Sequence, residues 1–243
     1  DMDVTDDAAM DKGFAELAAK WPKIDFVVHA IGFSDKTELT GRFINTSRDN
    51  FQRSLTISCY SLIEVARRAE PMMAEGGTIL TLTYQGSNRV TPYYNVMGVA
   101  KAALESSVRY LANDLGRDGI RVNAISPGPM KTLAGAAIGG ARATFRHTEQ
   151  NAPLRANATL EAIGGTAVWL CSDWGACTTG EIVRVGGGYP VRVDNRWVVA
   201  TNTSLDVLVV EGRFRPELFY NFQNHTFCIA QEMTGLCFEN KPA

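Results

Sequence analysis

The sequence predicts an α/β fold built around a parallel sheet, because two kinds of segment alternate along the first 190 residues. One kind is a short and almost wholly apolar run, as expected for a parallel strand that is covered on both faces. The other kind has apolar residues three and four positions apart, which is the spacing of an amphipathic helix. This alternation is typical of strand–helix–strand units that share one parallel sheet.

The individual elements follow from these patterns in chain order. Residues 1–5 are expected to end a strand and to turn into a helix over residues 6–21. Residues 25–32 form a buried apolar strand that ends in a glycine, and a polar loop separates it from a long helix over residues 47–73, whose apolar positions include Phe51 and Leu62. Further strands are expected at residues 78–84, 120–126 and 180–186, and further helices at residues 92–115 and 160–172. Residues 133–143 are rich in Gly and Ala, which favours a mobile lid over a core helix.

The alternating pattern stops near residue 190, where we place a domain boundary. Residues 1–189 form the predicted α/β domain, and residues 190–243 form an extension. The extension has β-like runs at residues 197–200, 205–210 and 225–230 without the alternating plan. Two interpretations of it remain open, a small β-rich appendage and a disordered tail.

The composition excludes several classes of function. A net charge of −2 gives no electrostatic sign of nucleic-acid binding. No run approaches the roughly 18 consecutive apolar residues of a membrane-spanning helix. The five cysteines and three histidines lack the spacing of a zinc site or a disulfide framework, so we expect no metal and a reducing, cytoplasmic location.

Tyr94 and Lys101 are the first candidate catalytic residues. They lie seven residues apart, almost two turns of the predicted helix over residues 92–115, so both are expected on one face of it. An ammonium group beside a phenol favours the phenolate and lowers the pKa of the phenol, which suits acid catalysis. Such pairs also occur by chance on exposed helices, but this one follows a strand that ends in Tyr84. Ligands of open α/β sheets bind at the carboxyl ends of strands.

Four ordered segments carry a resemblance to a known family. They are residues 29–33, 80–84, 94–101 and 121–134. They resemble the NADH-dependent enoyl-acyl-carrier-protein reductases of bacterial type II fatty acid synthesis, a divergent branch of the short-chain dehydrogenase/reductase superfamily. The resemblance covers about residues 1–189. It is specific because six residues separate Tyr94 from Lys101, whereas ordinary members of the superfamily have three.

The resemblance implies a Rossmann-like doubly wound parallel sheet, a homotetramer and the reduction of the trans-2 double bond of enoyl-acyl-carrier-protein thioesters by hydride from NADH. Tyr94 would bond the thioester carbonyl oxygen, Lys101 would bond the nicotinamide ribose, and Tyr84 would act in substrate or proton handling. NADPH remains an alternative to NADH, because the discriminating residue follows a strand that this sequence does not contain. Arg142 and Arg146 either meet the acidic carrier protein or lie on a solvated face.

The resemblance also implies a set of binding residues. Gly32 would allow close approach of the backbone to the cofactor, and Ser34 would lie near the substrate. For Ile31, Met130 and Leu133 the alternative is plain core packing. The complete set of implied cofactor contacts is Asp3, Val4, Ile31, Gly32, Lys101, Met130, Lys131, Thr132, Leu133 and Ala134.

The sequence departs from the family at both ends. No glycine-rich turn for a pyrophosphate is present, so the first βαβ unit is expected to be missing, with apolar faces and sheet edges exposed. Residues 191–243 match no part of the family, and a fragment, a fusion or a change of reading frame would each explain them. Two other functions therefore stay open. One is a truncated, non-catalytic oligomerisation or interaction module, and the other is a reductase of a different carbonyl or enoyl substrate.

Overall fold

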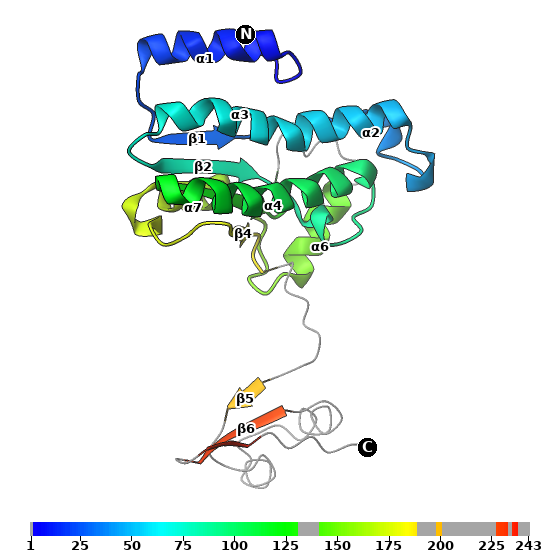
Figure 1. Cartoon of the computed structure of the whole chain (residues 1–243). Coiled ribbons are helices and arrows are strands. Elements are labelled where there is room, and N and C mark those ends of the chain that lie inside the picture. Colours follow the sequence, from blue (N-terminus) through cyan, green and yellow to red (C-terminus); the bar gives the residue numbers. More distant parts are fainter. Residues whose placement is uncertain (1, 131–140, 189–197, 201–226, 233–234, 238–243) are drawn as a thin grey trace, which may run out of the picture. The chain divides into compact units, whose positions relative to one another are not determined.

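The computed structural model describes residues 2–130, 141–188, 198–200, 227–232 and 235–237. The chain divides into two compact units, Asp1–Pro190 and Val191–Ala243, which we describe separately. Strands and helices alternate along the first unit (Figure 1), as the sequence pattern predicts.

Four parallel strands form the sheet of the first unit. They lie in the order β1 (Phe26–His29), β2 (Gly77–Leu82), β3 (Ile120–Pro127) and β4 (Ile182–Val185). The longest pairing joins β2 and β3, from Gly77 opposite Ile120 to Leu82 opposite Ile125. Since the strands are parallel, their carboxyl ends lie at one edge of the sheet, and this edge carries the candidate site described below.

Helices cover both faces of this sheet. On one face lie α3 (Ser61–Ala69) and α4 (Asn95–Leu115), and on the other lies α7 (Leu160–Cys171). The alternation along β2 separates the two cores, because Ile79 packs with residues of α3 and α4 while Leu80 packs with residues of α7. The doubly wound parallel sheet that the sequence predicts is therefore confirmed.

The remaining α-helices among the described residues of the first unit are α1 (Asp7–Lys20), α2 (Arg48–Leu55) and α6 (Ala141–Asn151). The side chain of Asp6 caps α1 by accepting hydrogen bonds from the backbone N–H groups of Ala8 and Ala9. Ser47 caps α2 in the same way through the N–H of Asn50. A wide π-helical turn over Thr56–Tyr60 joins α2 to α3 into one helical rod.

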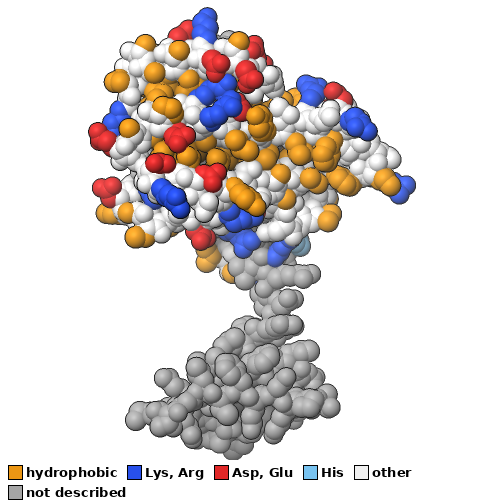
Figure 2. All heavy atoms as spheres, viewed as in Figure 1, with side chains coloured by type: hydrophobic (Ala, Val, Ile, Leu, Met, Phe, Trp, Pro, Cys, Tyr) orange, Lys and Arg blue, Asp and Glu red, His pale blue; other side chains and the backbone are white. Residues whose placement is uncertain are grey.

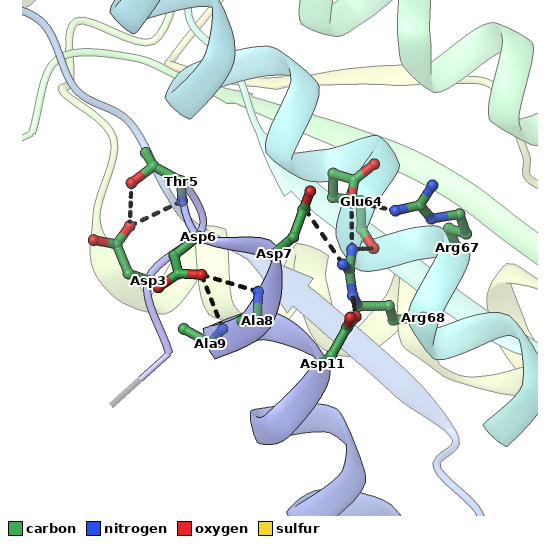
Figure 3. A network of polar contacts seen from close by, with 10 residues as sticks. All are labelled: Asp3, Thr5, Asp6, Asp7, Ala8, Ala9, Asp11, Glu64, Arg67 and Arg68. Atoms are coloured by element: carbon green, nitrogen blue, oxygen red, sulfur yellow. Dashed lines mark hydrogen bonds and ion pairs between the residues drawn. The ribbon is translucent and has the colours of Figure 1, made fainter.

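Ion pairs fasten α1 to α3 (Figure 3). The guanidinium group of Arg68 bonds the carboxylates of Glu64, Asp11 and Asp7, the last two at 2.7 and 3.4 Å. Arg67 bonds the same Glu64 carboxylate at 2.5 Å, but its own side chain is mostly exposed. Glu64 is buried, and its pKa is held below the ordinary value chiefly by the hydrogen bond from Arg68.

The first strand differs from its prediction. The side chains of Phe26 and Val28 are 56% and 49% exposed, whereas His29 is buried. The reason is that β1 pairs with β2 alone among the described strands, and α3 covers one of its faces while α7 packs against β2 and β3. A wholly apolar run therefore does not establish burial on both faces.

Other boundaries also differ from the predictions. Residues 2–5 form a turn and no strand, and α4 begins at Asn95 rather than at residue 92. The rod over residues 47–73 contains the π-helical turn, which its apolar spacing does not reveal. Helix α6 was not predicted. The expected lid falls on residues 133–143, of which residues 133–140 lie outside the described part of the chain.

The second unit contains three short strands among its described residues. They are β5 (Val198–Ala200), β6 (Phe227–Glu232) and β7 (Gly235–Cys237). β5 and β6 pair in parallel, and β6 and β7 pair antiparallel. Two of the expected β-like runs coincide with β5 and β6, and the run at residues 205–210 lies outside the described residues.

No helix in the described ranges is long and apolar enough to cross a membrane. Within the same ranges, no three His, Cys, Asp or Glu side chains are grouped so that they could hold a metal ion.

Candidate active site

Tyr94 lies at the N-cap position of α4, just before the helix begins, so the two catalytic candidates do not share a regular helical face. Its ring is only 6% exposed and packs with Leu39 and Met97. The ring of Tyr84 meets it edge-on, with the two centroids 5.0 Å apart and the planes at 61°. The structure thus brings the two predicted tyrosines into direct contact, ten residues apart in the sequence.

Two glycines create the space for the Tyr94 ring. A Cβ atom on Gly86 would lie 2.4 Å from Cδ1 and 2.7 Å from Cε1 of Tyr94, well inside van der Waals contact. A Cβ atom on Gly98 would lie 2.8 Å from the carbonyl oxygen of Gly86. The turn at Gln85–Ser87 can therefore approach the start of α4 only because both positions lack side chains.

Lys101 extends from α4 to the carboxyl end of β2. Its Nζ donates a 2.7 Å hydrogen bond to the carbonyl oxygen of Leu82. The side chain is buried, and this burial lowers the pKa of Lys101 to about 8, although Cys59 and Glu105 oppose the shift. Lys101 is therefore charged at neutral pH and can lose its proton in mildly alkaline solution.

The expected effect of Lys101 on Tyr94 is wrong. The pKa of Tyr94 is raised well above its ordinary value, first by burial and then by the neighbouring Tyr84 and Glu105. Burial penalises the phenolate, and the ammonium group of Lys101 is directed at Leu82. Tyr94 is thus a firmly protonated hydrogen-bond donor.

Gly32 and Ser34 lie on the loop that follows β1, beside this site. A Cβ atom on Gly32 would lie 3.9 Å from Nζ of Lys101 and 3.8 Å from Cε of Met97, which are ordinary contacts. Ser34 donates a 3.2 Å hydrogen bond to Oδ1 of Asn50. Gly32 is therefore next to the lysine, and Ser34 is held against α2.

Val4 and Ile31 meet at a separate hollow. Both line a space of about 320 Å³ whose other lining residues are mostly apolar. Asp3 is exposed and accepts two hydrogen bonds from Thr5, which lower its pKa from the ordinary value. The structure thus brings together two of the residues implied as cofactor contacts, Val4 and Ile31.

Met130 is less closely connected to the site. Met130 packs against the core formed with α7 and lines a different hollow of about 330 Å³. Lys131, Thr132, Leu133 and Ala134 lie outside the described residues.

The sequence reasoning missed Met97 and Glu105. Met97, Lys101 and Glu105 follow one another at intervals of four residues within α4. This is the spacing of one helix face, so the face could have been recognised from the sequence. Glu105 accepts a 2.7 Å hydrogen bond from the hydroxyl group of Thr83, beyond the end of β2, and this bond fixes its carboxylate near the lysine.

Comparisons with known proteins agree with this geometry. The family described as Enoyl-(Acyl carrier protein) reductase matches residues 1–190. Enoyl-acyl-carrier-protein reductase (NADH) 1 of Rhizobium meliloti (strain 1021) is 59% identical over 187 residues, which are 77% of this chain and 69% of the relative.

Solved structures give the same result. The Anaplasma phagocytophilum reductase in complex with NAD is 53% identical with a TM-score of 0.76, over 79% of this chain and 73% of that one. The Bacillus cereus enoyl-acyl-carrier-protein reductase, solved with NADP+ and an indole naphthyridinone, is 50% identical with a TM-score of 0.76, over 77% and 73%.

A second family, the Sigma-54 interaction domain, matches residues 176–227, a short segment that overlaps the end of the first match and continues past it. The first match spans more than half of the chain, and the relatives share half or more of the aligned residues. The chain therefore belongs to the enoyl-acyl-carrier-protein reductase family.

Proposed function

We propose that this chain reduces the trans-2 double bond of enoyl-acyl-carrier-protein thioesters with NADH in fatty acid biosynthesis. The observation that carries the proposal is the grouping of Tyr84, Tyr94 and Lys101 around the carboxyl end of β2, with Gly32 alongside. The relatives named above carry this activity in their names. With no membrane-spanning helix in the described residues, we place the activity in the cytoplasm.

Tyr94 and Lys101 have different tasks in this proposal. NADH supplies the hydride for the β-carbon of the enoyl group. The phenol of Tyr94 donates a hydrogen bond to the thioester carbonyl oxygen, where negative charge develops as the enolate forms. Its raised pKa keeps the proton on the phenol, so Tyr94 acts as a donor and a solvent-derived proton completes the reaction. The charge of Lys101 raises the local potential and stabilises the same enolate.

The described residues of the site fit a dinucleotide. Lys101 has three N–H donors, one of which is used by Leu82, and an ammonium group of this kind suits a ribose hydroxyl. Gly32 exposes backbone beside it, and Val4 and Ile31 line an apolar hollow suited to an adenine ring. Asp3, Met130 and residues 131–134 complete the proposed set. Relatives solved with NAD and with NADP+ keep NADPH as an alternative to NADH.

The carrier protein has a candidate docking place near α6. A hollow of about 590 Å³ lies between residues 85–92 and α6, and Arg89, Arg146 and His147 are among its lining residues. Positive charge at this position favours an acidic partner. We propose that the acyl carrier protein approaches the site from this side, which brings its thioester toward Tyr94 and Ser34.

Self-association is the second part of the partner proposal. Figure 2 shows apolar side chains in a band across the face formed by α3 and α4. The exposed apolar residues of these helices and of the turn before α3 include Tyr60, Val99 and Tyr110. Exposed apolar bands of this kind mark interfaces, and we propose that four copies of the chain associate. Light scattering on the purified chain tests this, and a monomer at micromolar concentration contradicts it.

The activity is tested by following NADH oxidation with an enoyl thioester as substrate. Tyr94→Phe is expected to reduce kcat about 100-fold, the usual effect of removing an oxyanion donor. Gly164→Ala, at a position of α7 where a Cβ atom meets open space, is the control and should stay within twofold of the wild type. No NADH oxidation by the wild-type chain, or equal kcat for both variants, contradicts the proposal.

A further inference from the structure

The rod formed by α2 and α3 buries a line of polar side chains against the loop after β1. These residues are Asn50, Ser54, Ser58 and Ser61, and we call them the polar ridge. Each is at most 4% exposed. Buried polar groups are costly unless they are hydrogen-bonded, so their partners show what the ridge does.

Ser58 holds the backbone of one loop residue at both ends. Its Oγ accepts a 2.9 Å hydrogen bond from the N–H of Phe33 and donates a 3.0 Å hydrogen bond to the carbonyl oxygen of the same residue. These two bonds fix the position of the peptide units on either side of Phe33. One of those units begins at Gly32.

Asn50 and Ser61 bond residues on either side of Phe33, and Ser54 bonds Asn50. Oδ1 of Asn50 accepts hydrogen bonds from the N–H of Asp35 at 2.9 Å and from the hydroxyl group of Ser34 at 3.2 Å. Ser61 lies 2.8 Å from Nε2 of His29, where β1 ends. The ridge therefore follows the chain from the end of β1 to Asp35.

The π-helical turn helps to align Ser58 with Asn50 and Ser54 along the rod. Steps of four residues, such as those from Asn50 to Ser58, drift by about 40° around a regular helix of 3.6 residues per turn. A turn with i→i+5 hydrogen bonds contains more residues and opposes this drift. The turn spans Thr56–Tyr60, so Ser58 lies at its centre.

The loop that the ridge holds is the one next to Lys101. The Cβ position of Gly32 lies 3.9 Å from Oγ of Ser58 and 3.9 Å from Nζ of Lys101. We propose that the polar ridge is a positioning device for this loop, and that Ser58 is the positioning residue that sets the Gly32 backbone beside Lys101 at the cofactor site. The structural part rests on the contacts alone, and the effect on the cofactor rests on the proposed function.

Amide hydrogen exchange on the full chain tests the structural part without any cofactor. Ser58→Ala removes both bonds and is expected to speed exchange of the Phe33 amide at least tenfold. Ser172→Ala is the matched control, because it removes a part-buried hydroxyl that bonds locally to the carbonyl oxygen of Trp169 at the end of α7. Equal exchange at Phe33 in the two variants would overturn the proposal.

Asn50→Ala provides a second test if Ser58→Ala does not fold. It is expected to speed exchange of the Asp35 amide, whose acceptor it removes, while Phe33 stays protected by Ser58. This residue-by-residue correspondence is particular to a ridge that positions the loop. An Asp35 amide that exchanges as in the wild type contradicts it.

Steady-state kinetics test the effect on the cofactor. Ser58→Ala is expected to raise KM for NADH about tenfold, the scale of one to two net hydrogen bonds, with KM for the enoyl thioester within twofold. A merely structural role would move both constants or neither, as expected for Ser172→Ala. Unchanged KM for NADH in Ser58→Ala overturns the cofactor part. A wild-type chain without activity counts against the proposed function, and hydrogen exchange still decides the ridge.

Discussion

Replacing Gly86 by alanine should displace the ring of Tyr94 and so disable the site without altering any polar group. The new Cβ atom would lie 2.4 Å from Cδ1 of Tyr94, and ordinary carbon–carbon contacts are about 3.5 Å or more. The ring must therefore move by about 1 Å. It is nearly fully buried between Tyr84, Leu39 and Met97, so it cannot move freely.

The expected size of the effect follows from this displacement. A misplacement of 1 Å at a reacting centre costs about 100-fold in rate, and overpacking a core costs about 1–3 kcal/mol of stability. We expect kcat of Gly86→Ala to fall about 100-fold in the NADH oxidation assay, with a modest loss in the thermal midpoint. Gly164→Ala is the control, because a Cβ atom there on α7 meets open space. A folded Gly86→Ala variant whose kcat stays within twofold of the wild type would refute the reasoning.

Three further predictions follow from the same contacts. A Cβ atom on Gly32 meets only ordinary contacts, so Gly32→Ala should keep the thermal midpoint of the wild type. It should bind NADH about tenfold more weakly in a calorimetric titration, because the added methyl group hinders the close approach of the cofactor to the backbone. An unchanged affinity for NADH would show that the cofactor does not approach Gly32 closely. The value of kcat/KM should fall as the pH rises through about 8, because Lys101 then loses its proton. Lys101→Arg should shift or remove this alkaline fall, because arginine stays charged. An identical pH profile for the variant contradicts the assignment. Arg68→Ala should lower the free energy of unfolding, measured in urea, by about 3 kcal/mol, because the buried carboxylate of Glu64 then loses its largely buried cationic partner. Arg67→Ala should cost less than about 1 kcal/mol, because the side chain of Arg67 is exposed. Equal losses for the two variants would contradict this distinction.

The sequence predicted the sheet and most helices because their patterns are local. The apolar periodicity of residues 160–172 predicts the bounds of α7, Leu160–Cys171, to within one residue. The start of α4 could not be found in this way. Tyr93 and Asn95 have positive φ angles of 61° and 33°, which residues other than glycine rarely adopt without support from tertiary contacts. The Tyr94 position at the N-cap therefore depends on packing that the sequence does not display.

The polar ridge shows the same limit more clearly. The helical pattern over residues 47–73 suggested Phe51 as a core residue, yet Phe51 is exposed while Asn50 and Ser54 are buried. Hydrophobicity alone predicts that Phe51 is buried and that Asn50 and Ser54 are exposed, which is the opposite of the observed burial. Asn50 and Ser54 can be buried because their hydrogen bonds are satisfied by the loop and by one another, and such partners are distant in sequence.

The corrected pKa of Tyr94 also changes how the site can work. Spacing alone suggested that Lys101 makes Tyr94 a better acid, but burial acts on both groups and pushes each toward its neutral form. The phenol of Tyr94 then remains protonated at any physiological pH, and Lys101 is the group of this pair whose charge changes at mildly alkaline pH. A charged lysine at the end of β2 and a neutral phenol packed against Tyr84 supply a positive potential and a hydrogen-bond donor, the two things that a developing enolate requires. The proposed roles of Tyr94 as a hydrogen-bond donor and of Lys101 as a positive charge therefore depend on the burial of both side chains, which their spacing in the sequence does not determine.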